Sequence, residues 1–275
     1  MGAYPTIARD VAATLLPVAA VFVLLALATK RDGVLAAARR CSREAATNFG
    51  LVLVNYILLA PIMLAPVLAV RAALPVPPGL APVWDAVPQM LLLVLAILLI
   101  EFAAYWRHRI EHQPGLWRFH ATHHADEELH WLSVLRKHPV SKFLEMLIDS
   151  LPVLLLGLPM WTIAAAQLIR SWWGYFIHAD VSWTLGPAGR WLISPAAHRL
   201  HHIRDEALMG SNYGNMLTVW DRLFGTWRDP APHLNCATGI AEGTRGLWGE
   251  LKRPWEARYR TSNPSQLGGE VADAL

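Results

Sequence analysis

Residues 87–124 read VPQMLLLVLAILLIEFAAYWRHRIEHQPGLWRFHATHH, a long apolar segment that runs directly into a group of histidines. The apolar part, Val87–Ile100 continuing to Trp106, approaches the roughly 20 residues that a helix needs to cross a bilayer. The histidines follow at helical spacings, as His108-Arg-Ile-Glu-His112 and His120-Ala-Thr-His123-His124. Residues at i and i+4 share one face of a helix. The stretch therefore predicts a membrane-spanning helix that ends beside a cluster of metal ligands.

A second copy of the His-x-x-His-His spacing occurs later in the chain, at His198-Arg-Leu-His201-His202. Two single histidines, His138 and His178, lie between the two copies. Ten of the twelve histidines thus belong to one pattern beside apolar segments. Helical faces of this kind can converge on metal ions, and two copies of such a motif in one chain are a specific signal.

The composition is typical of a membrane protein, with 16% charged residues, 13 tryptophans and a mean hydropathy of +0.30. Besides the run at 87–106, Val11–Thr29 and Leu51–Leu74 have nearly the length of a bilayer-spanning helix. Glu101 lies within the third run, where a buried acid is costly unless it has a partner or a function. A position at the membrane surface is the alternative for this residue.

The segments between the apolar runs differ in charge. Residues 30–47 contain five Lys and Arg residues, whereas residues 75–86 contain four prolines and neither Lys nor Arg. Because cytoplasmic loops carry an excess of Lys and Arg, we expect residues 30–47 in the cytoplasm and residues 75–86 outside. The third span then returns to the cytoplasm at His108. The first histidine cluster is therefore predicted on the cytoplasmic face.

A fourth apolar region, residues 146–176, is too short for two full spans and is interrupted by Pro and Gly residues. A metal site shared by the histidines before and after this region requires an even number of crossings. We therefore expect a helical hairpin of two half or tilted helices, with Gly157-Leu-Pro159 as its turn. A single crossing that separates two unrelated histidine groups is the alternative.

These features predict an all-α fold, an integral membrane helical bundle of three spans plus the hairpin, with a cytosolic histidine-rich helical cap. We expect three regions: an N-terminal transmembrane region at 1–86, the histidine-rich domain at 87–230, and a C-terminal region at 231–275. Trp248 and Trp255, interleaved with basic residues, predict a helix on the lipid surface ahead of a disordered tail. The cytoplasmic loops account for the net charge of +3, so we expect no nucleic-acid partner.

The number and type of the ligands constrain the chemistry. Imidazole suits zinc, copper and iron, and one zinc ion takes three or four protein ligands. Eight to ten histidines exceed that number and predict two metal ions with four or five ligands each. Two ions of this kind beside a membrane favour activation of O2 by iron and attack on a C–H bond of a lipid. A hydrolase would usually add a carboxylate ligand or a general base.

Further motifs surround the histidines: Arg136-Lys-His138-Pro139, Phe176-Ile-His178-Ala179-Asp180, Pro195-Ala-Ala-His198, Asn212-Tyr-Gly214 and Trp220-Asp-Arg-Leu-Phe-Gly-Thr-Trp227. With the order of the histidine motifs, they resemble the fatty acid hydroxylase superfamily, also called the sterol desaturase family. The resemblance covers about residues 90–230. It implies a membrane-embedded di-iron oxygenase with a helical bundle, and it makes residues 87–230 the catalytic domain.

The resemblance also implies the site and its partners. The metal ligands and catalytic residues would be His108, His112, His120, His123, His124, His138, His178, His198, His201 and His202. They would hold two Fe ions, for which Zn can substitute on overexpression, and O2 would be the co-substrate. The substrate would be a membrane lipid, such as a sterol or a fatty acyl lipid. We expect a separate electron donor (ferredoxin, cytochrome or reductase), and we favour hydroxylation over desaturation.

Three positions depart from the family pattern or extend it. His130 lies where the family more often has Asn, which leaves its role open. Asp180 replaces a frequent Asn, and we expect Asp180 and Asp205 either to accept a hydrogen bond from a ligand imidazole or to be surface carboxylates.

Two other classes of function fit part of the pattern. His108-Arg-Ile-Glu111-His112 matches the H-x-x-E-H motif of zinc metallopeptidases, in which Glu is the general base. That interpretation leaves the other patterned histidines unexplained. A metal transporter or a haem-binding membrane protein is the second alternative, but transport sites tend to lie near the middle of the membrane. Here the histidines lie beyond the ends of the predicted spans.

Overall fold

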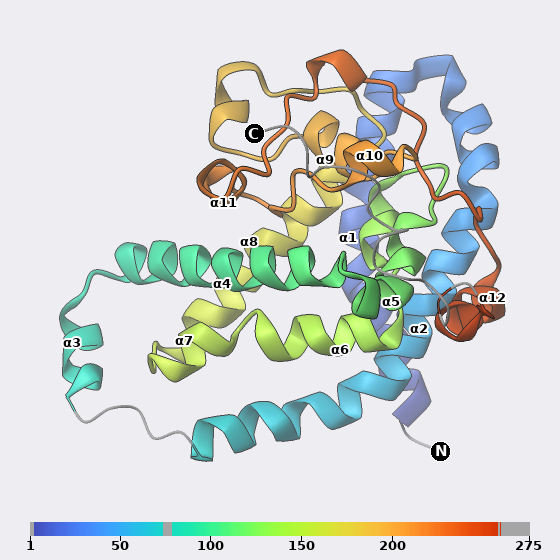
Figure 1. The fold of residues 1–275 in the computed structure, drawn as a ribbon. Coiled ribbons are helices and arrows are strands. Elements are labelled where there is room, and N and C mark those ends of the chain that lie inside the picture. Colours follow the sequence, from blue (N-terminus) through green and yellow to red (C-terminus); the bar gives the residue numbers. More distant parts are fainter. Residues whose placement is uncertain (1–2, 74–78, 258, 260–275) are drawn as a thin grey trace.

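The computed structural model describes residues 3–73, 79–257 and 259, and the regular secondary structure in this part of the chain is helical (Figure 1). Extended backbone in the described residues forms isolated bridges rather than a sheet, between Leu192 and Leu217 and between Ile203 and Thr238. The prediction of an all-α fold is confirmed. Of the predicted C-terminal tail, residues 260–275 lie outside the described residues.

Helices α1 (Ala3–Lys30) and α2 (Val34–Ala73) follow each other across a 3₁₀ turn, Arg31–Gly33. The sequence predicted a loop at residues 30–47, but the helix resumes at Val34 because this segment is rich in Ala and Arg, which favour helix. Two helical segments, Ala12–Leu59 and Gln89–Glu111, are long and apolar enough to cross a membrane. The number of membrane crossings, three spans plus a hairpin, therefore stays a prediction.

Helix α4 (Gln89–Glu111) carries the apolar run predicted as the third span, and the short helix α3 (Leu80–Ala86) precedes it. Leu92, Ala96 and Ile100 recur every four residues on α4 and are buried, as expected for one face of a helix. This face packs against Val153 and Ala166 of the following helices. The packing fixes the rotation of α4 and therefore the direction in which its C-terminal histidines point.

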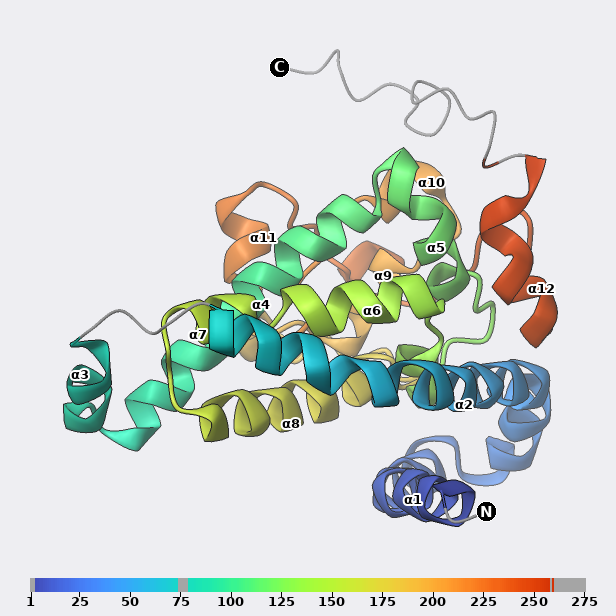
Figure 2. The same ribbon diagram turned by 90° about the horizontal axis from the view of Figure 1, so that it is seen from below.

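The predicted hairpin is present. Helix α6 (Pro139–Ile148) runs toward α7 (Leu151–Leu155), and α8 (Met160–Ile177) returns in the opposite direction (Figure 2). The chain turns at Gly157, whose φ of 66° is a left-handed conformation that glycine adopts at little steric cost. Pro159 is the N-cap residue of α8. The turn therefore lies at the predicted Gly157-Leu-Pro159, and it brings the end of α8 back to the end of α4.

Short helices form the helical cap beyond the C-terminal half of α4, and the last of them packs against α2 (Figure 1). They are α5 (Pro114–His124), α9 (Pro195–His201), α10 (Glu206–Met209), α11 (Val219–Leu223) and α12 (Leu247–Lys252), with 3₁₀ turns at Trp131–Leu135, Gly186–Arg190, Ala231–His233 and Arg253–Trp255. Trp117 and Ala121 of α5 pack with Leu200 and Ile203 in one buried cluster. This cluster holds the two histidine-bearing helices α5 and α9 against each other.

A buried ion pair ties the cap to the apolar helices. Glu101 of α4 is 1% exposed and accepts a hydrogen bond from Nε of Arg170 on α8 at 2.5 Å. Its other oxygen accepts the backbone N–H groups of Met216 and Leu217 at 2.8 and 3.0 Å. Glu101 therefore has a buried partner rather than a position at the membrane surface. Loss of one member of such a pair costs about 3–5 kcal/mol, because the other charge is left buried alone.

Candidate metal centre

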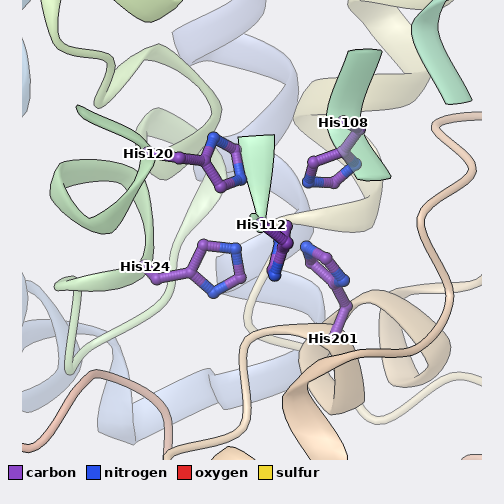
Figure 3. A group of neighbouring side chains, drawn as sticks. All are labelled: His108, His112, His120, His124 and His201. Carbon is purple, nitrogen blue, oxygen red and sulfur yellow. The ribbon is translucent and has the colours of Figure 1, made fainter. Parts of the chain in front are cut away.

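Five histidines surround a common point at the end of α4 (Figure 3). They are His108 and His112 from α4 and its C-cap, His120 and His124 from α5, and His201 from α9. One ring nitrogen from each lies within 4.8 Å of the others. We call these five residues the first group.

Four more histidines form a second group, with ligand atoms that also lie within 4.8 Å of one another. They are His123 of α5, His178 at the C-cap of α8, His198 of α9 and His202 at the C-cap of α9. All four are buried. The hairpin turn described above is what returns His178 from α8 to this position.

The spacing of the His-x-x-His-His motif explains why one motif supplies both groups. A helix turns about 100° per residue, so the residues at i+3 and i+4 lie on opposite sides of the residue at i and point about 100° apart. His120 and His124 belong to the first group, whereas His123 belongs to the second. In the other copy, His198 and His202 belong to the second group and His201 to the first.

The two groups lie side by side. The rings of His124 and His202 are stacked with their centroids 4.4 Å apart, and those of His198 and His201 are stacked at 5.3 Å. Each pair joins one member of the first group to one member of the second. The arrangement therefore suits two metal ions in neighbouring sites.

Backbone carbonyls fix the orientation of three imidazoles. Nδ1 of His108 lies 2.7 Å from the carbonyl oxygen of Tyr213, and Nδ1 of His201 lies 2.7 Å from that of Ser211. Nδ1 of His178 lies 2.7 Å from the carbonyl oxygen of Gly174. A carbonyl accepts only, so each Nδ1 carries the proton and each Nε2 keeps its lone pair. Metal-bound histidines usually have such a partner on the other nitrogen.

The first group has ligand atoms that nothing else in the described chain satisfies. Nε2 of His108, His112, His120 and His201, and both ring nitrogens of His124, are buried without a hydrogen-bond partner among the described residues. Buried polar atoms are otherwise nearly always paired, so this many in one place call for a ligand. A metal ion that accepts five nitrogen lone pairs fits these orphaned atoms.

In the second group, one ring nitrogen lies within hydrogen-bonding distance of two others. Nε2 of His198 lies 3.0 Å from Nε2 of His178 and 3.2 Å from Nε2 of His202. Because Nε2 of His178 already presents a lone pair, one proton cannot satisfy all three atoms. For metal–nitrogen bonds of about 2.1 Å, two ligands at a right angle are about 3.0 Å apart. The observed spacing therefore fits a shared metal ion.

Burial keeps these imidazoles neutral, as metal ligation requires. Desolvation lowers the pKa of His201 to about 4 and that of His178 to about 3, although the Ser211 and Gly174 carbonyls oppose the shift. The pKa values of His123, His124, His198 and His202 lie well below the ordinary value, also because of burial. At neutral pH all six therefore present lone pairs.

The structure brings nine of the ten predicted ligands together and leaves His138 apart. His138 is the N-cap residue of α6, and its Nδ1 accepts the backbone N–H of Val140 at 3.2 Å. Its Nε2 donates to the carbonyl oxygen of Leu251 at 3.3 Å. Both ring nitrogens are thus occupied, and His138 belongs to neither group among the described residues. The structure therefore places His138 at a helix cap, apart from both groups.

His130 also lies outside both groups. Its Nδ1 lies 2.9 Å from the Glu128 carbonyl oxygen and 3.0 Å from Oγ of Ser133, so the ring is bonded within its own turn. The two predicted carboxylates have other roles as well. Asp180 pairs with Lys30 and with Arg199, and Asp205 caps α10 through the N–H of Ala207. Neither bonds a ligand imidazole.

Sequence reasoning missed the groups that support the ligands. The carbonyls of Ser211, Tyr213 and Gly174 were not identifiable, because every residue has a carbonyl and only the fold selects these three. Asp221 was missed too: its Oδ1 accepts the N–H of Tyr213 at 2.7 Å and its Oδ2 that of Gly214 at 2.8 Å. Burial raises the pKa of Asp221 to about 6.

Glu111, the general base in the peptidase alternative, is already engaged by neighbouring side chains. It pairs with Arg107, and its Oε2 lies 3.5 Å from Nδ1 of His120. The peptidase motif needs two histidines on one zinc ion, whereas His108 and His112 converge with three further histidines. The geometry therefore gives Glu111 a position beside a ligand imidazole.

A small cavity adjoins both groups. Its volume is about 100 Å³, and it is lined by His108 and His120 of the first group and by His123, His178 and His198 of the second. We call it the metal-side cavity. A substrate atom in this space would lie beside both groups of ligands.

Comparisons with known proteins agree with this geometry. The profile of the fatty acid hydroxylase family matches residues 93–226. An ornithine lipid hydroxylase, OlsE, of Rhizobium tropici is 30% identical over 178 residues, 64% of this chain and 54% of that protein. The alkylglycerol monooxygenase of Homo sapiens is 32% identical over 133 residues, 48% of this chain and 29% of that protein.

A Delta(7)-sterol 5(6)-desaturase, ERG3, of Candida albicans is 28% identical over 161 residues, 58% of this chain and 40% of that protein. The chain thus spans about half or less of the length of these relatives. No solved structure matches it significantly. The matched region, residues 93–226, contains all nine converging histidines. This region is therefore a fatty acid hydroxylase domain.

Proposed function

We propose that the protein is a membrane-bound di-iron oxygenase that hydroxylates a C–H bond of a lipid. The overall reaction is R–H + O2 + two electrons + two protons → R–OH + H2O. The observation that carries the proposal is the pair of histidine groups, nine imidazoles with converging and otherwise unsatisfied nitrogens in the described chain. The relatives support the reaction class, because their names describe hydroxylation, monooxygenation and desaturation of lipids.

The donor set fits two iron ions. The first group would hold one ion with up to five imidazoles and the second group would hold another with four. Bound iron would supply the reduction of O2 and the removal of a hydrogen atom from carbon. The ligand set differs from soluble di-iron bundles, which use Glu and Glu-x-x-His motifs. Zinc also binds imidazole and would substitute for iron on overexpression.

The chain's own residues supply orientation and exclusion of water. The carbonyls of Tyr213, Ser211 and Gly174 hold the imidazole N–H groups, so that each Nε2 points into its group. Nearly complete burial of His124, His201 and His202 keeps bulk water from these ligands. A substrate carbon in the metal-side cavity would lie beside both groups, and its position there would decide between hydroxylation and desaturation.

The surface supports a place in the membrane. Leu16 and Leu24 of α1, Met90 of α4 and Leu168 of α8 are each more than half exposed. Such residues on several long helices suit contact with lipid chains. The charge difference between residues 30–47 and 75–86 favours a cytoplasmic active site. A cytoplasmic site can receive electrons from a separate ferredoxin, cytochrome or reductase.

Isotopically labelled O2 tests the reaction whichever lipid is the substrate. Membranes of cells that express the full chain would be supplied with labelled O2, and their lipids analysed by tandem mass spectrometry. We expect a lipid that carries one labelled oxygen and whose formation is lost in a His201→Ala, His202→Ala double variant. The matched control, His138→Ala, removes a histidine outside both groups and should keep the product.

Two outcomes would overturn this proposal. One is the absence of any labelled lipid above the level in cells without the protein. The other is a labelled lipid that forms equally in the His201→Ala, His202→Ala variant. Peptidase activity that depends on Glu111 would instead favour the metallopeptidase alternative.

A further inference from the structure

A second cavity leads away from the metal-side cavity. Its volume is about 340 Å³, and we call it the apolar cavity. The two cavities share four lining residues, Val134, Lys137, Glu145 and Ser171. The two cavities are therefore neighbours, divided by these four side chains, and they lie in series between the histidines and the helices of the bundle.

The apolar cavity lies among helices suited to the membrane. Its wall includes Leu15 of α1, Val52 and Leu59 of α2, and Met146 of α6. Leu15, Val52 and Leu59 belong to the segment Ala12–Leu59, which is long and apolar enough to cross a membrane. A hydrocarbon chain in this cavity would exchange lipid contacts for similar apolar contacts, so burial of the chain carries no polar penalty.

The metal-side cavity has the opposite character. It is lined by three cationic and three anionic side chains, Arg107, Lys137, Arg170, Glu111, Glu145 and Asp149. These groups are paired: Arg107 Nε lies 2.6 Å from Asp149 Oδ1, and Lys137 pairs with Glu145. A methyl-terminated chain here would displace water from the charged groups, and their hydrogen bonds to water would be lost without replacement, which is unfavourable. A polar headgroup would form hydrogen bonds with the same charged groups in place of the water.

The change from apolar to polar occurs at one ion pair. Lys137 and Glu145 line both cavities, and Glu145 also accepts a hydrogen bond from Lys142 at 2.5 Å. Lys142 lines the apolar cavity, beside Met146. This position is where a bound lipid would change from chain to headgroup.

We infer that the lipid substrate enters with its polar headgroup toward the histidines and its chain in the apolar cavity. The oxidised C–H bond then lies in the headgroup or within a few bonds of it, not at the far end of the chain. Because both cationic and anionic side chains line the metal-side cavity, we expect a small headgroup with both donors and acceptors of hydrogen bonds. The inference rests on the proposed function and specifies its substrate class.

The orientation can be measured by binding, without turnover. The probe is a palmitoyl lysophosphatidylethanolamine whose chain ends in a trifluoromethyl group, so that phosphorus reports the headgroup and fluorine reports the chain end. The full chain in detergent would be loaded with paramagnetic Co²⁺ or diamagnetic Zn²⁺ under nitrogen. We expect Co²⁺ to accelerate phosphorus relaxation severalfold more than fluorine relaxation, relative to the Zn²⁺ form.

Two variants examine the cavities separately. A Lys137→Met, Glu145→Met double variant removes both members of the pair together and leaves Lys142, which is partly exposed, as the one cation without its partner carboxylate. It should reduce the phosphorus effect severalfold. Leu59→Trp narrows the apolar cavity and should weaken the effect on both nuclei. Lys252→Met, on α12 and outside both cavities, is the control and should match the parent protein.

The outcomes separate this inference from the proposed function. The head-first orientation alone would be overturned if the effects, corrected for the different gyromagnetic ratios of the two nuclei, placed fluorine as near to the metal as phosphorus or nearer. It would also be overturned by the absence of any effect in protein shown to hold Co²⁺. Co²⁺ binding that does not fall in the His201→Ala, His202→Ala variant would overturn the proposed metal sites, and the orientation with them.

Discussion

The two histidine groups use the same motif but are supported by different parts of the chain. In the first group, His108 and His201 donate to the carbonyls of Tyr213 and Ser211, which lie together in the loop at residues 211–214. In the second group, His178 donates to Gly174, one turn earlier in its own helix. His108 of the first group therefore depends on a carbonyl 105 residues away in sequence, whereas His178 is oriented within its own helix.

The groups also differ in the number of their ligands. The first has five imidazoles and the second has four. A site with five ligands retains a typical set of four after one is lost, but a site with four retains only three. We therefore expect loss of one histidine to weaken metal binding more in the second group than in the first, although the His-x-x-His-His motifs contribute to both.

The largest difference in metal retention is expected between two single variants, each of which lacks one histidine of one group. Structural metal sites gain about 12 kcal/mol on binding, or about 3 kcal/mol per ligand, so loss of one ligand of four weakens binding about 100-fold. We expect His198→Ala to lose the metal of the second group on dialysis, and His120→Ala to retain that of the first more strongly. Metal analysis of the two variants after dialysis measures this. Equal retention would show that the groups do not differ in this way.

A substitution that weakens the loop at residues 211–214 should have an intermediate effect on metal affinity, and only in the first group. Asp221→Asn replaces one oxygen acceptor of the Tyr213 and Gly214 N–H groups with an amide donor, which disturbs the carbonyl that orients His108. Loss of such support typically weakens metal binding about 10-fold to 100-fold. Competition with a chelator would measure it. Asp205→Asn, at the cap of α10, is the control, and weakening of both groups would contradict the expected separation.

Substitution of His138 should have the smallest effect and none on metal. His138→Ala removes the N-cap acceptor of α6, and loss of an N-cap costs about 1 kcal/mol of stability. The thermal unfolding temperature should fall by a few degrees while metal content stays at the level of the parent protein. A decrease in bound metal would place His138 back among the ligands.

The sequence predicted much of the fold because the relevant patterns are local. The apolar run before His108, the Gly157-Leu-Pro159 turn and the helical histidine spacings each depend on neighbouring residues. The segment at residues 34–47 was predicted as a loop from its charges, yet it continues α2 because Ala and Arg favour helix. Charge indicates the side of the membrane but does not end a helix.

The site was less predictable where it depends on tertiary contacts. His138 precedes a proline that begins a helix, and in sequence such an N-cap histidine cannot be told from a lone ligand. On each helix the middle histidine of the motif, His123 or His201, belongs to the other group from the two histidines on either side of it. This division depends on how α5 and α9 are rotated when they pack together. The carbonyls of Ser211 and Tyr213 have no sequence signature at all.

The most direct test of the two-site account is the metal content of protein purified from iron-supplemented cells, compared with the His201→Ala, His202→Ala variant, which removes one ligand from each group. We predict about two metal ions per chain in the parent protein and a clear decrease in the variant. One zinc ion per chain, unaffected by this variant but lost on substitution of His108 and His112, would contradict the account and favour the metallopeptidase alternative. Folded protein that binds no metal would contradict both.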